Sequence, residues 1–501
     1  MNRNILSIVP FLLYSIFILI VPVIFLVYYA FHSSLSPLLT AVLLAATKQS
    51  FLQASVSTVL AVALGLPAGM FLTMYGGRGR NVIVSLLLVT YVMPGIIMAL
   101  GIISLLGYSS RFWEIIYGNV AYNSPLVAVL SFATGSATNL QEVYSAKVLG
   151  AKDGEILRRF YWKNLLRGGL LGAIMTFILS FEGFSLPLIV GGPSYSTIEV
   201  LIYEFKSIFP SLTQFPFSNA ALLGVLQIAM LLIPLYLYVT IRTSSLRSSS
   251  SLQNPFSRYR ILSLLLLIIF IFVVYAPLLS MFLRYPFWDI DFSRITARLQ
   301  ISLLGLIFNT LFFSFASTFV SFLISMFLVL YRHGRFGNTF VLLPLILSPV
   351  TLALSFFLIY GIYIPTELLI IVIFAVIVLP LTFRMLTQSL DTVPKSEGFS
   401  SLVLGDGQVS SLFRVQLPRI KGEVSTILSI AFITVMGQFA SIVTVYTSLT
   451  ETITIGIYRL LQLRDTAGTY SLTEVFLIVI FISSYIINAL GRGRSGVSGE
   501  A

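Results

Sequence analysis

The sequence predicts an all-α polytopic membrane protein with twelve transmembrane helices, arranged as two parallel six-helix repeats. Three observations predict this fold: an apolar composition, twelve apolar stretches of spanning length, and motifs that return at one fixed offset. Of the 501 residues, 57% are hydrophobic and only 10% are charged, whereas a soluble domain carries about 25% charged residues. The mean hydropathy of +0.98 agrees, so the composition argues against a soluble enzyme.

The residue types present also exclude several kinds of site. The chain has no cysteine, so disulfides, zinc–thiolate sites and iron–sulfur clusters are ruled out. Its two histidines, His32 and His333, lie far apart in the sequence, so we expect no metal site. The net charge of +12 is typical of cytoplasmic loops in a membrane protein, and it does not indicate a nucleic-acid partner.

Twelve stretches are apolar and long enough for a spanning helix, which needs about 20 residues. In the first half of the chain they cover residues 5–31, 51–75, 82–107, 119–138, 165–190 and 219–241. In the second half they cover residues 261–284, 303–331, 337–361, 366–388, 424–447 and 472–491.

The distribution of lysine and arginine predicts the orientation. With both termini in the cytoplasm, 22 of the 30 basic residues fall in inside loops and 8 in outside loops. Short cytoplasmic loops carry an excess of Lys and Arg. We therefore expect a multi-pass protein of the plasma or inner membrane whose two termini are cytoplasmic.

Motifs in the two halves match at an offset of 255 residues. The matching pairs include Pro94 and Pro349, Leu149-Gly150 and Leu404-Gly405, and Phe184 and Phe439. An even number of spans in each repeat makes both copies enter and leave on the same side, so the repeats are parallel. We expect one six-span domain at residues 1–242 and another at 259–491, with a serine-rich cytoplasmic linker at 243–258 and a tail at 492–501.

In each half, the longest charged inside segment joins the fourth and fifth spans. It starts at Asn139 in the first half and at Pro394 in the second. Each copy has a short helical stretch, a Leu-Gly stop and a second helical stretch that rises into the next span. Glycine at the stop permits a sharp turn and close approach of another backbone. Such a segment is suited to docking in a groove of a soluble partner.

These loops resemble the coupling loops of permeases from binding-protein-dependent ABC importers of the type I, maltose-permease-like class. That family's pattern is Glu-Ala-Ala, three residues, Gly, and further on Leu-Pro. The glycine place is held by Gly150 and Gly405, and Leu417-Pro418 holds the Leu-Pro place. The resemblance implies contact with an ATPase for Tyr144, Ser145, Ala146, Leu149, Gly150, Ala151, Phe399, Ser400, Ser401, Leu404, Gly405, Asp406, Leu417 and Pro418. The family's glutamate is missing from both copies, and Trp162-Lys163 replaces Leu-Pro in the first half.

The resemblance covers nearly the whole chain as two fused permease units, and it implies a mechanism. Two separate ATP-binding-cassette subunits each take one coupling helix, and their closure moves the halves by alternating access. An external bilobed binding protein delivers the solute. The chain has no Gly-x-x-x-x-Gly-Lys-Ser/Thr loop, so ATP and Mg²⁺ belong to the partner subunits and the chain itself is not an enzyme and carries no cofactor. Fused permeases of this kind resemble those for ferric iron and thiamine.

Six residues are candidates for the solute pathway or its gate: Glu182, Phe184, Gln438, Phe439, Pro94 and Pro349. Glu182 is an acidic residue well inside a predicted span, where a lipid-facing charge costs about 2.5–3.5 kcal/mol, so it should face the bundle or water. A carboxylate satisfied by a neighbouring helix is the alternative. The matched prolines would kink a pathway helix or be ordinary span prolines, and the matched phenylalanines would form a gate or simply pack.

Two other functions compete with an importer permease. A self-contained secondary transporter also uses a 6+6 arrangement, but it needs coupling charges within its spans, where Glu182 stands alone. A membrane enzyme would need His, Asp or Glu clustered at one depth, and the sequence shows no such cluster. The substrate is not readable, and sugars, polyamines and phosphonates remain open beside ferric iron and thiamine.

Overall fold

The structure is a computed structural model, and its description covers most of the chain. The described residues are 2–33, 36–77, 79–107, 110–192, 195–208, 215, 217–241, 256–286, 288, 290–330, 341, 344, 347–403 and 405–492. Regular structure in these ranges is entirely helical, as the sequence predicts. Most of the linker 243–258 and nearly all of the tail 492–501 lie outside the described residues.

The chain divides into two compact units. Unit 1 contains Met1–Ser34, Ile202–Val225 and Tyr285–Ala501, and unit 2 contains Leu35–Leu201 and Leu226–Arg284. Unit 1, which comes mostly from the second half of the sequence, therefore also contains residues 1–34 of the first half, and unit 2, which comes mostly from the first half, also contains residues 260–284 of the second. The predicted domains at 1–242 and 259–491 follow the sequence repeat instead of the packing, and they remain a prediction.

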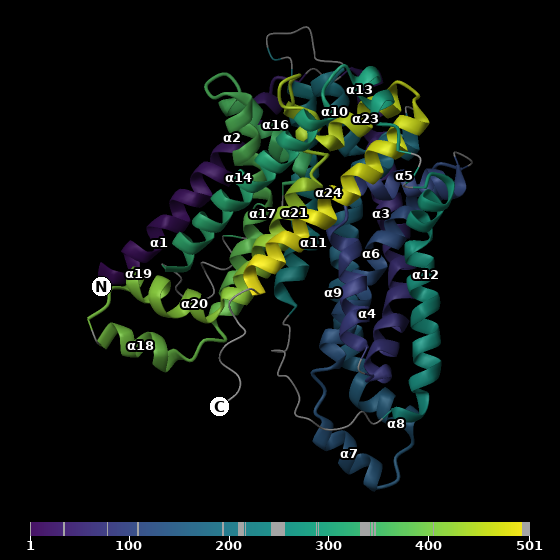
Figure 1. The fold of residues 1–501 in the computed structure, drawn as a ribbon, viewed down its shortest axis with the longest axis vertical. Coiled ribbons are helices and arrows are strands. Elements are labelled where there is room, and N and C mark those ends of the chain that lie inside the picture. Colours follow the sequence, from purple (N-terminus) through teal and green to yellow (C-terminus); the bar gives the residue numbers. More distant parts are fainter. Residues whose placement is uncertain are drawn as a thin grey trace. The chain divides into compact units, whose positions relative to one another are not determined.

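Unit 2 is a bundle of long helices. Its elements are α3 (Pro37–Tyr75), α4 (Arg80–Val92), α5 (Gly95–Leu106), α6 (Phe112–Gly135), α7 (Leu140–Val148), α8 (Asp153–Ile156), α9 (Trp162–Phe181) and α12 (Arg260–Arg284). It shares α10 (Ile198–Ser207) and α11 (Ser218–Thr240) with unit 1. Figure 1 shows α3, α6 and α9 side by side, with α7 beyond one end of them.

Buried polar side chains tie α3 and α6 to α9. Gln53 Nε2 of α3 donates to Ser180 O at 3.1 Å, and Asn123 Nδ2 of α6 donates to Ser180 Oγ at 3.3 Å. Hydrogen bonds between spanning helices are worth about 0.6 kcal/mol each on average. These contacts set the register of the three helices around the end of α9.

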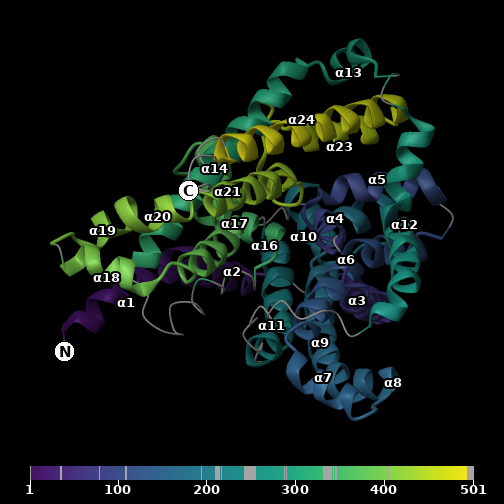
Figure 2. The ribbon, with the colours of Figure 1, turned by 60° about the horizontal axis from the view of Figure 1, so that its bottom comes forward.

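Unit 1 has the same kinds of elements. They are α1 (Asn2–Ser15), α2 (Val21–Ala30), α13 (Phe292–Leu299), α14 (Leu303–Leu330), α16 (Pro349–Tyr360), α17 (Thr366–Leu390), α18 (Lys395–Val403), α19 (Gln408–Ser411), α20 (Leu417–Arg419), α21 (Lys421–Met436), α22 (Ile442–Val445), α23 (Ile453–Gln462) and α24 (Thr466–Arg492). Figure 2 shows α23 running beside α24. Phe11 of α1 packs with Phe383 of α17, their ring centroids 6.5 Å apart.

Twelve continuous spanning helices are not confirmed. In the described part of the chain, nine helices are long and apolar enough to cross a membrane, or ten if the bent pair α4 and α5 is one span. The predicted span 424–447 is shorter than expected, because α21 ends at Met436 and Gly437 follows. The predicted span 337–361 is described as a helix over Pro349–Tyr360, and residues 331–340 lie outside the described residues. The result is still an all-α, multi-pass membrane protein.

Two other predicted spans have different limits. The stretch 51–75 is part of α3, which begins at Pro37 with Ser36 as its cap; Ser36 Oγ accepts a hydrogen bond from Leu39 N at 3.1 Å. The stretch 165–190 corresponds to a helical run over Asp153–Phe181. That run ends before the predicted limit, since Glu182 has left the helical conformation. The apolar pattern located these helices but not their ends.

Candidate functional site

The first coupling segment, residues 139–161, begins with α7. Asn139 caps this helix, and its side chain accepts a hydrogen bond from Gln141 N at 3.1 Å. An asparagine at this place satisfies one of the N–H groups that lack a partner in the first turn. The cap therefore fixes where the helix begins, at the end of unit 2 where Figure 1 places α7.

A left-handed glycine ends α7. Gly150 has a φ of +87°, which costs a residue with a Cβ far more than it costs glycine. Ala151 N donates to Ala146 O at 3.0 Å, and Gly150 N donates to Lys147 O at 3.0 Å. These two bonds form the Schellman pattern, which satisfies the last carbonyls of a helix. The predicted Leu-Gly stop is thus confirmed as a sharp helix end.

The second coupling segment, residues 394–416, repeats the first element for element. Each limit is displaced by 255 residues. Helix α18 corresponds to α7, α19 corresponds to α8, and the π-helical turn Leu412–Gln416 corresponds to the turn Leu157–Tyr161. Gly405 has a φ of +95°, and Asp406 N donates to Ser401 O at 3.0 Å, the counterpart of the bond at Ala151. The sequence repeat is therefore a repeat of backbone geometry as well.

Apolar side chains stand exposed at the tips of these segments. Val148 and Leu149 are each 87% exposed, and Val403 is 85% exposed. Adjacent exposed apolar residues beside charged ones mark surfaces that another molecule covers. Leu404, the counterpart of Leu149, lies outside the described residues.

The other predicted coupling residues lie on these helices. Tyr144, Ser145 and Ala146 lie on α7, Phe399, Ser400 and Ser401 on α18, and Leu417 and Pro418 on α20. Ser401 is buried and donates to Ser411 Oγ at 2.6 Å. At α20 the helix breaks before α21, whereas Trp162 at the matching place begins the unbroken α9.

Each coupling segment is braced by ion pairs. In unit 2, Lys147 Nζ lies 3.4 Å from Asp153 Oδ1. In unit 1, Arg419 lies 3.5 Å from Glu397, and Arg414 lies 4.0 Å from Asp406. All these groups are partly exposed, so each pair contributes little stability, about 0–1 kcal/mol. Each pair joins residues within or next to one coupling segment, so its effect is local to that segment.

The two matched prolines begin helices. Pro94 caps α5, and the axes of the runs Arg80–Thr90 and Gly95–Leu106 differ by 92°. Pro349 is the first residue of α16, which Ser348 caps through its hydroxyl. The chain bends sharply at Pro94, and a pathway-shaping role for the two prolines stays a prediction.

Glu182 stands where α9 ends. Its Oε1 atom is buried and accepts no hydrogen bond in the described structure. Glu199 of α10 lies close enough to act on it electrostatically. Its counterpart Gly437 ends α21 in the same way, so this carboxylate belongs to one repeat alone.

The matched phenylalanines are buried within their own units. Phe184 is 3% exposed and Phe439 is 1% exposed. Phe439 packs on Tyr458, with ring centroids 5.2 Å apart. Gln438, next to it, is half-buried. Such contacts are expected if the two phenylalanines only pack within the protein, and a gating role remains a prediction.

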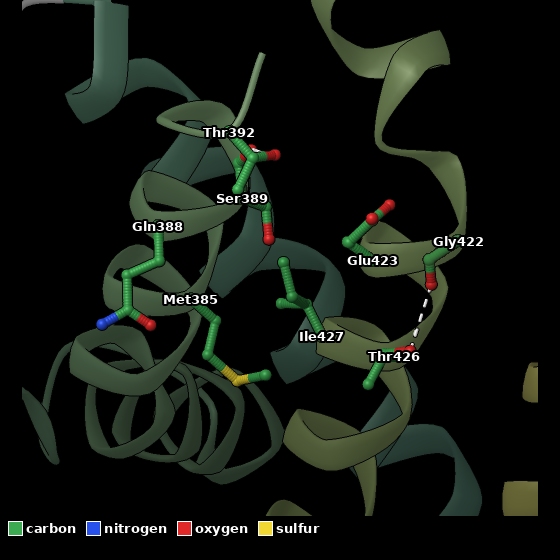
Figure 3. A pocket seen from close by; sticks show the side chains of 8 residues that line it. All are labelled: Met385, Gln388, Ser389, Thr392, Gly422, Glu423, Thr426 and Ile427. Atoms are coloured by element: carbon green, nitrogen blue, oxygen red, sulfur yellow. Dashed lines mark hydrogen bonds between the residues drawn. The ribbon is translucent and has the colours of Figure 1, made fainter. Parts of the chain in front are cut away.

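A cleft of about 470 Å³ opens between α17 and α21 in unit 1. Its lining is Met385, Gln388, Ser389, Thr392, Gly422, Glu423, Thr426 and Ile427. Figure 3 shows Met385 and Ile427 between the two helices, whereas the Gln388 amide points away from α21 and Thr426 donates to Gly422 O of its own helix at 3.1 Å. A volume of this size is typical of small-molecule pockets.

Comparison with known proteins assigns the family. Residues 61–247 match the family described as binding-protein-dependent transport system inner membrane component. This range contains the whole first coupling segment. The match covers 187 of the 501 residues, so over this part the chain is similar to that family. The description names a component of transport systems, and the match includes the first coupling segment but not the second, which lies at residues 394–416.

Three curated relatives resemble parts of this permease. The thiamine transport system permease protein ThiP of Haemophilus influenzae is 26% identical over 46% of each chain. The spermidine/putrescine transport system permease protein PotC of Escherichia coli is 27% identical over 33% of this chain and 64% of its own. A probable molybdenum ABC transporter permease protein of Haloferax volcanii is 25% identical over 30% of this chain and 60% of its own. The matches thus span about half to two thirds of these relatives.

Two features of the permease site were not predicted from the sequence. One is the apolar tip, where Val148 and Val403 were not among the expected contact residues although each comes two residues before the glycine stop. The other is Phe256, which lies in the predicted linker and yet is 1% exposed. An aromatic residue at the end of a serine-rich stretch is the signal that was available for it.

Proposed function

We propose that this chain is the permease subunit of an ABC importer, which forms the solute pathway by alternating access. The two coupling segments dock on separate ATP-binding-cassette subunits, one for each segment. An extracytoplasmic binding protein delivers the solute, and both termini are cytoplasmic. The observation that carries this proposal is the pair of exposed tips, Val148-Leu149 and Val403, each held by a left-handed glycine at the same offset.

The absence of cysteine makes a direct test of docking simple. Leu149→Cys and Val403→Cys would be labelled with a maleimide, with and without co-purified ATPase subunits. We expect the ATPase to slow labelling of both variants by tenfold or more. Ile362→Cys is the matched control, since Ile362 is 88% exposed on the turn between α16 and α17. Equal labelling rates with and without the ATPase at both tips would refute docking there.

Dependence on ATP separates the importer from the alternative secondary transporter. Proteoliposomes containing the permease, the ATPase and the binding protein should take up solute when ATP is supplied on the ATPase side. Uptake driven by an ion gradient through this chain alone would contradict the proposal. The relatives named for thiamine and for spermidine and putrescine favour a cationic organic solute, with thiamine as the first choice and ferric iron as a further candidate.

Glu182 is our candidate for contact with such a cation. A buried carboxylate oxygen without a donor would be satisfied by a passing cationic group. Glu182→Gln keeps the shape and removes the charge, so we expect uptake to fall about tenfold, equivalent to about 1.4 kcal/mol. Binding of the ATPase should be unchanged. Normal uptake kinetics in this variant would remove Glu182 from the pathway.

A further inference from the structure

One side chain of the predicted linker is part of the unit 2 core. Phe256 lies four residues before α12 and is 1% exposed. It belongs to a buried cluster with Val143, Ile156, Tyr161 and Leu165. The rings of Phe256 and Tyr161 meet edge to face, with centroids 5.3 Å apart. The end of the linker is therefore docked and does not hang free.

The residues around this ring come from the first coupling segment and the helix that follows it. Val143 lies on α7, Ile156 on α8, Tyr161 in the π-helical turn and Leu165 on α9. All four are buried, with exposures of 0%, 0%, 3% and 0%. We call this group the socket. Because one buried cluster joins Phe256 to four successive elements, its packing limits how the coupling segment can fold back on the bundle.

The chain after Phe256 is also held in unit 2. Tyr259 N donates to Phe256 O at 3.0 Å, which closes a short turn into α12. Further along α12, Tyr275 Oη donates to Leu86 O at 2.7 Å, and Ser280 Oγ donates to Gly101 O at 3.3 Å. The ring is thus held between the first coupling segment and α12, which both belong to unit 2.

The second repeat lacks this arrangement. At the offset of 255, the socket residues correspond to Gly398, Ser411, Gln416 and Ile420. Three of the four apolar side chains are therefore missing. The hydrogen bond between Ser401 and Ser411 joins α18 to α19 instead. Among the residues that the structure describes, this aromatic anchor is found at the first coupling segment.

We propose that the socket is a docking site for the segment that leads into α12, with Phe256 as its anchor, and that this contact positions the first coupling segment. The occupant is this chain's own segment 256–259. Phe256 is a positioning residue, because it acts through the coupling segment and has no assigned contact with solute or ATPase. The docking stands on its own geometry, whereas the positioning of a coupling segment rests on the proposed function.

The docking is tested by hydrogen exchange on the full chain. Phe256→Ala should raise the exchange rates of amides in residues 143–161 at least tenfold. Phe256→Leu, which refills most of the socket, should raise them less than threefold. Phe413→Ala is the matched control, since Phe413 is 53% exposed in the π-helical turn of unit 1. Unchanged exchange in Phe256→Ala, in a protein that melts as wild type, would overturn the docking.

A cut chain tests whether the docked segment holds without its tether. A protease site inserted at Ser249-Ser250 allows cleavage of the folded protein before Phe256. We expect the cut wild-type chain to keep its protection at residues 143–161 and its two fragments to stay together. The cut Phe256→Ala protein should exchange as fast as the uncut variant, because the hydrogen bonds of α12 to Leu86 and Gly101 keep the segment in unit 2 with or without the cut. Loss of protection on cleavage of the wild type would overturn the proposal.

Positioning is tested by the ratio of ATP hydrolysed to solute taken up. Phe256→Ala should raise this ratio at least threefold with the ATPase still bound, and Phe256→Leu should restore it. An unchanged ratio, together with raised exchange at residues 143–161, would overturn the positioning role while the docking stands. If the wild-type chain binds no ATPase at all, the proposed function fails, and the exchange experiment still decides the docking.

Discussion

The same helix pair is packed closely in unit 2 and held apart in unit 1. In unit 2, Gly168 and Gly172 of α9 face α6, and a Cβ on Gly168 would overlap Leu130 O. At the offset of 255 the residues are Glu423 and Ile427, and both line the cleft between α17 and α21. At these two positions glycine in unit 2 allows a close contact, whereas larger side chains in unit 1 border a cleft whose exposed lining is mostly apolar. The repeated topology allows one unit to be rigid where the other offers space.

The largest effect should come from closing the space at Gly168. Gly168→Ala places a methyl group in overlap with atoms of Thr134, Leu130 and Ser131, two of which are backbone atoms that cannot easily move. Overpacking of this kind costs about 1–3 kcal/mol or more. The matched variant is Gly422→Ala in the cleft, where a Cβ meets nothing within 4 Å. In thermal unfolding in detergent, Gly168→Ala should clearly lower the melting temperature and Gly422→Ala should hardly change it. Equal melting temperatures of the two variants would contradict the comparison.

The two coupling segments should respond alike where their backbones agree. Gly150 and Gly405 both have positive φ, and a Cβ on either glycine would enter open space. Alanine at either place should therefore cost only backbone strain, about 1–2 kcal/mol, seen as faster proteolysis of the segment. Gly407→Ala is the control, because Gly407 has equal space and no positive φ. A variant of Gly150 that behaves like this control would show that the left-handed turn is not required.

The sequence predicted what depends on period and spacing. The offset of 255 placed both coupling segments, and the glycine stops at Gly150 and Gly405 have the expected backbone. What it missed depends on contacts between distant residues. The burial of Phe256 depends on four elements packing together. The placement of residues 1–34 in unit 1 and of α12 in unit 2 depends on packing that an apolar pattern does not encode. The end of α9 at Glu182 was missed because the residues after it are as apolar as those before.

A smaller contrast lies between α3 and α14. In unit 1, Thr382 Oγ1 meets Ser321 Oγ at 2.9 Å and Ser325 Oγ at 2.7 Å. In unit 2, Gly65 and Gly69 allow direct contact with α6 instead. Thr382→Val keeps the shape and removes both hydrogen bonds, so it should cost about 1 kcal/mol, at about 0.6 kcal/mol for each bond. Denaturant unfolding would measure this loss, and a variant as stable as wild type would show that the serines contribute packing alone.

The smallest expected effect is on how the stability of the fold decreases at acidic pH. Asp465, before α24, is 3% exposed and accepts a hydrogen bond from Arg294 Nε at 3.0 Å. The Arg294 guanidinium holds the pKa of Asp465 below its usual value. A carboxyl group whose pKa is lowered by folding stabilises the fold above its unfolded pKa of about 3.9, and this contribution is lost as pH falls through the lowered value. As pH is lowered from 6 to 3, the melting temperature should therefore fall less steeply in Asp465→Asn than in the wild type. The asparagine side-chain oxygen can still accept the hydrogen bond from Gly468 N.

The control for this acid effect is an ion pair in the other unit. Asp153 of unit 2 lies 3.4 Å from Lys147, and their side chains are 23% and 39% exposed. Asp153→Asn should leave the acid slope close to that of wild type, because water screens an exposed pair. The arginines around Asp465 are themselves 43% and 60% exposed, which keeps the expected change small. If Asp153→Asn flattened the slope as much as Asp465→Asn, burial of the carboxylate would not be what distinguishes the two units in acid.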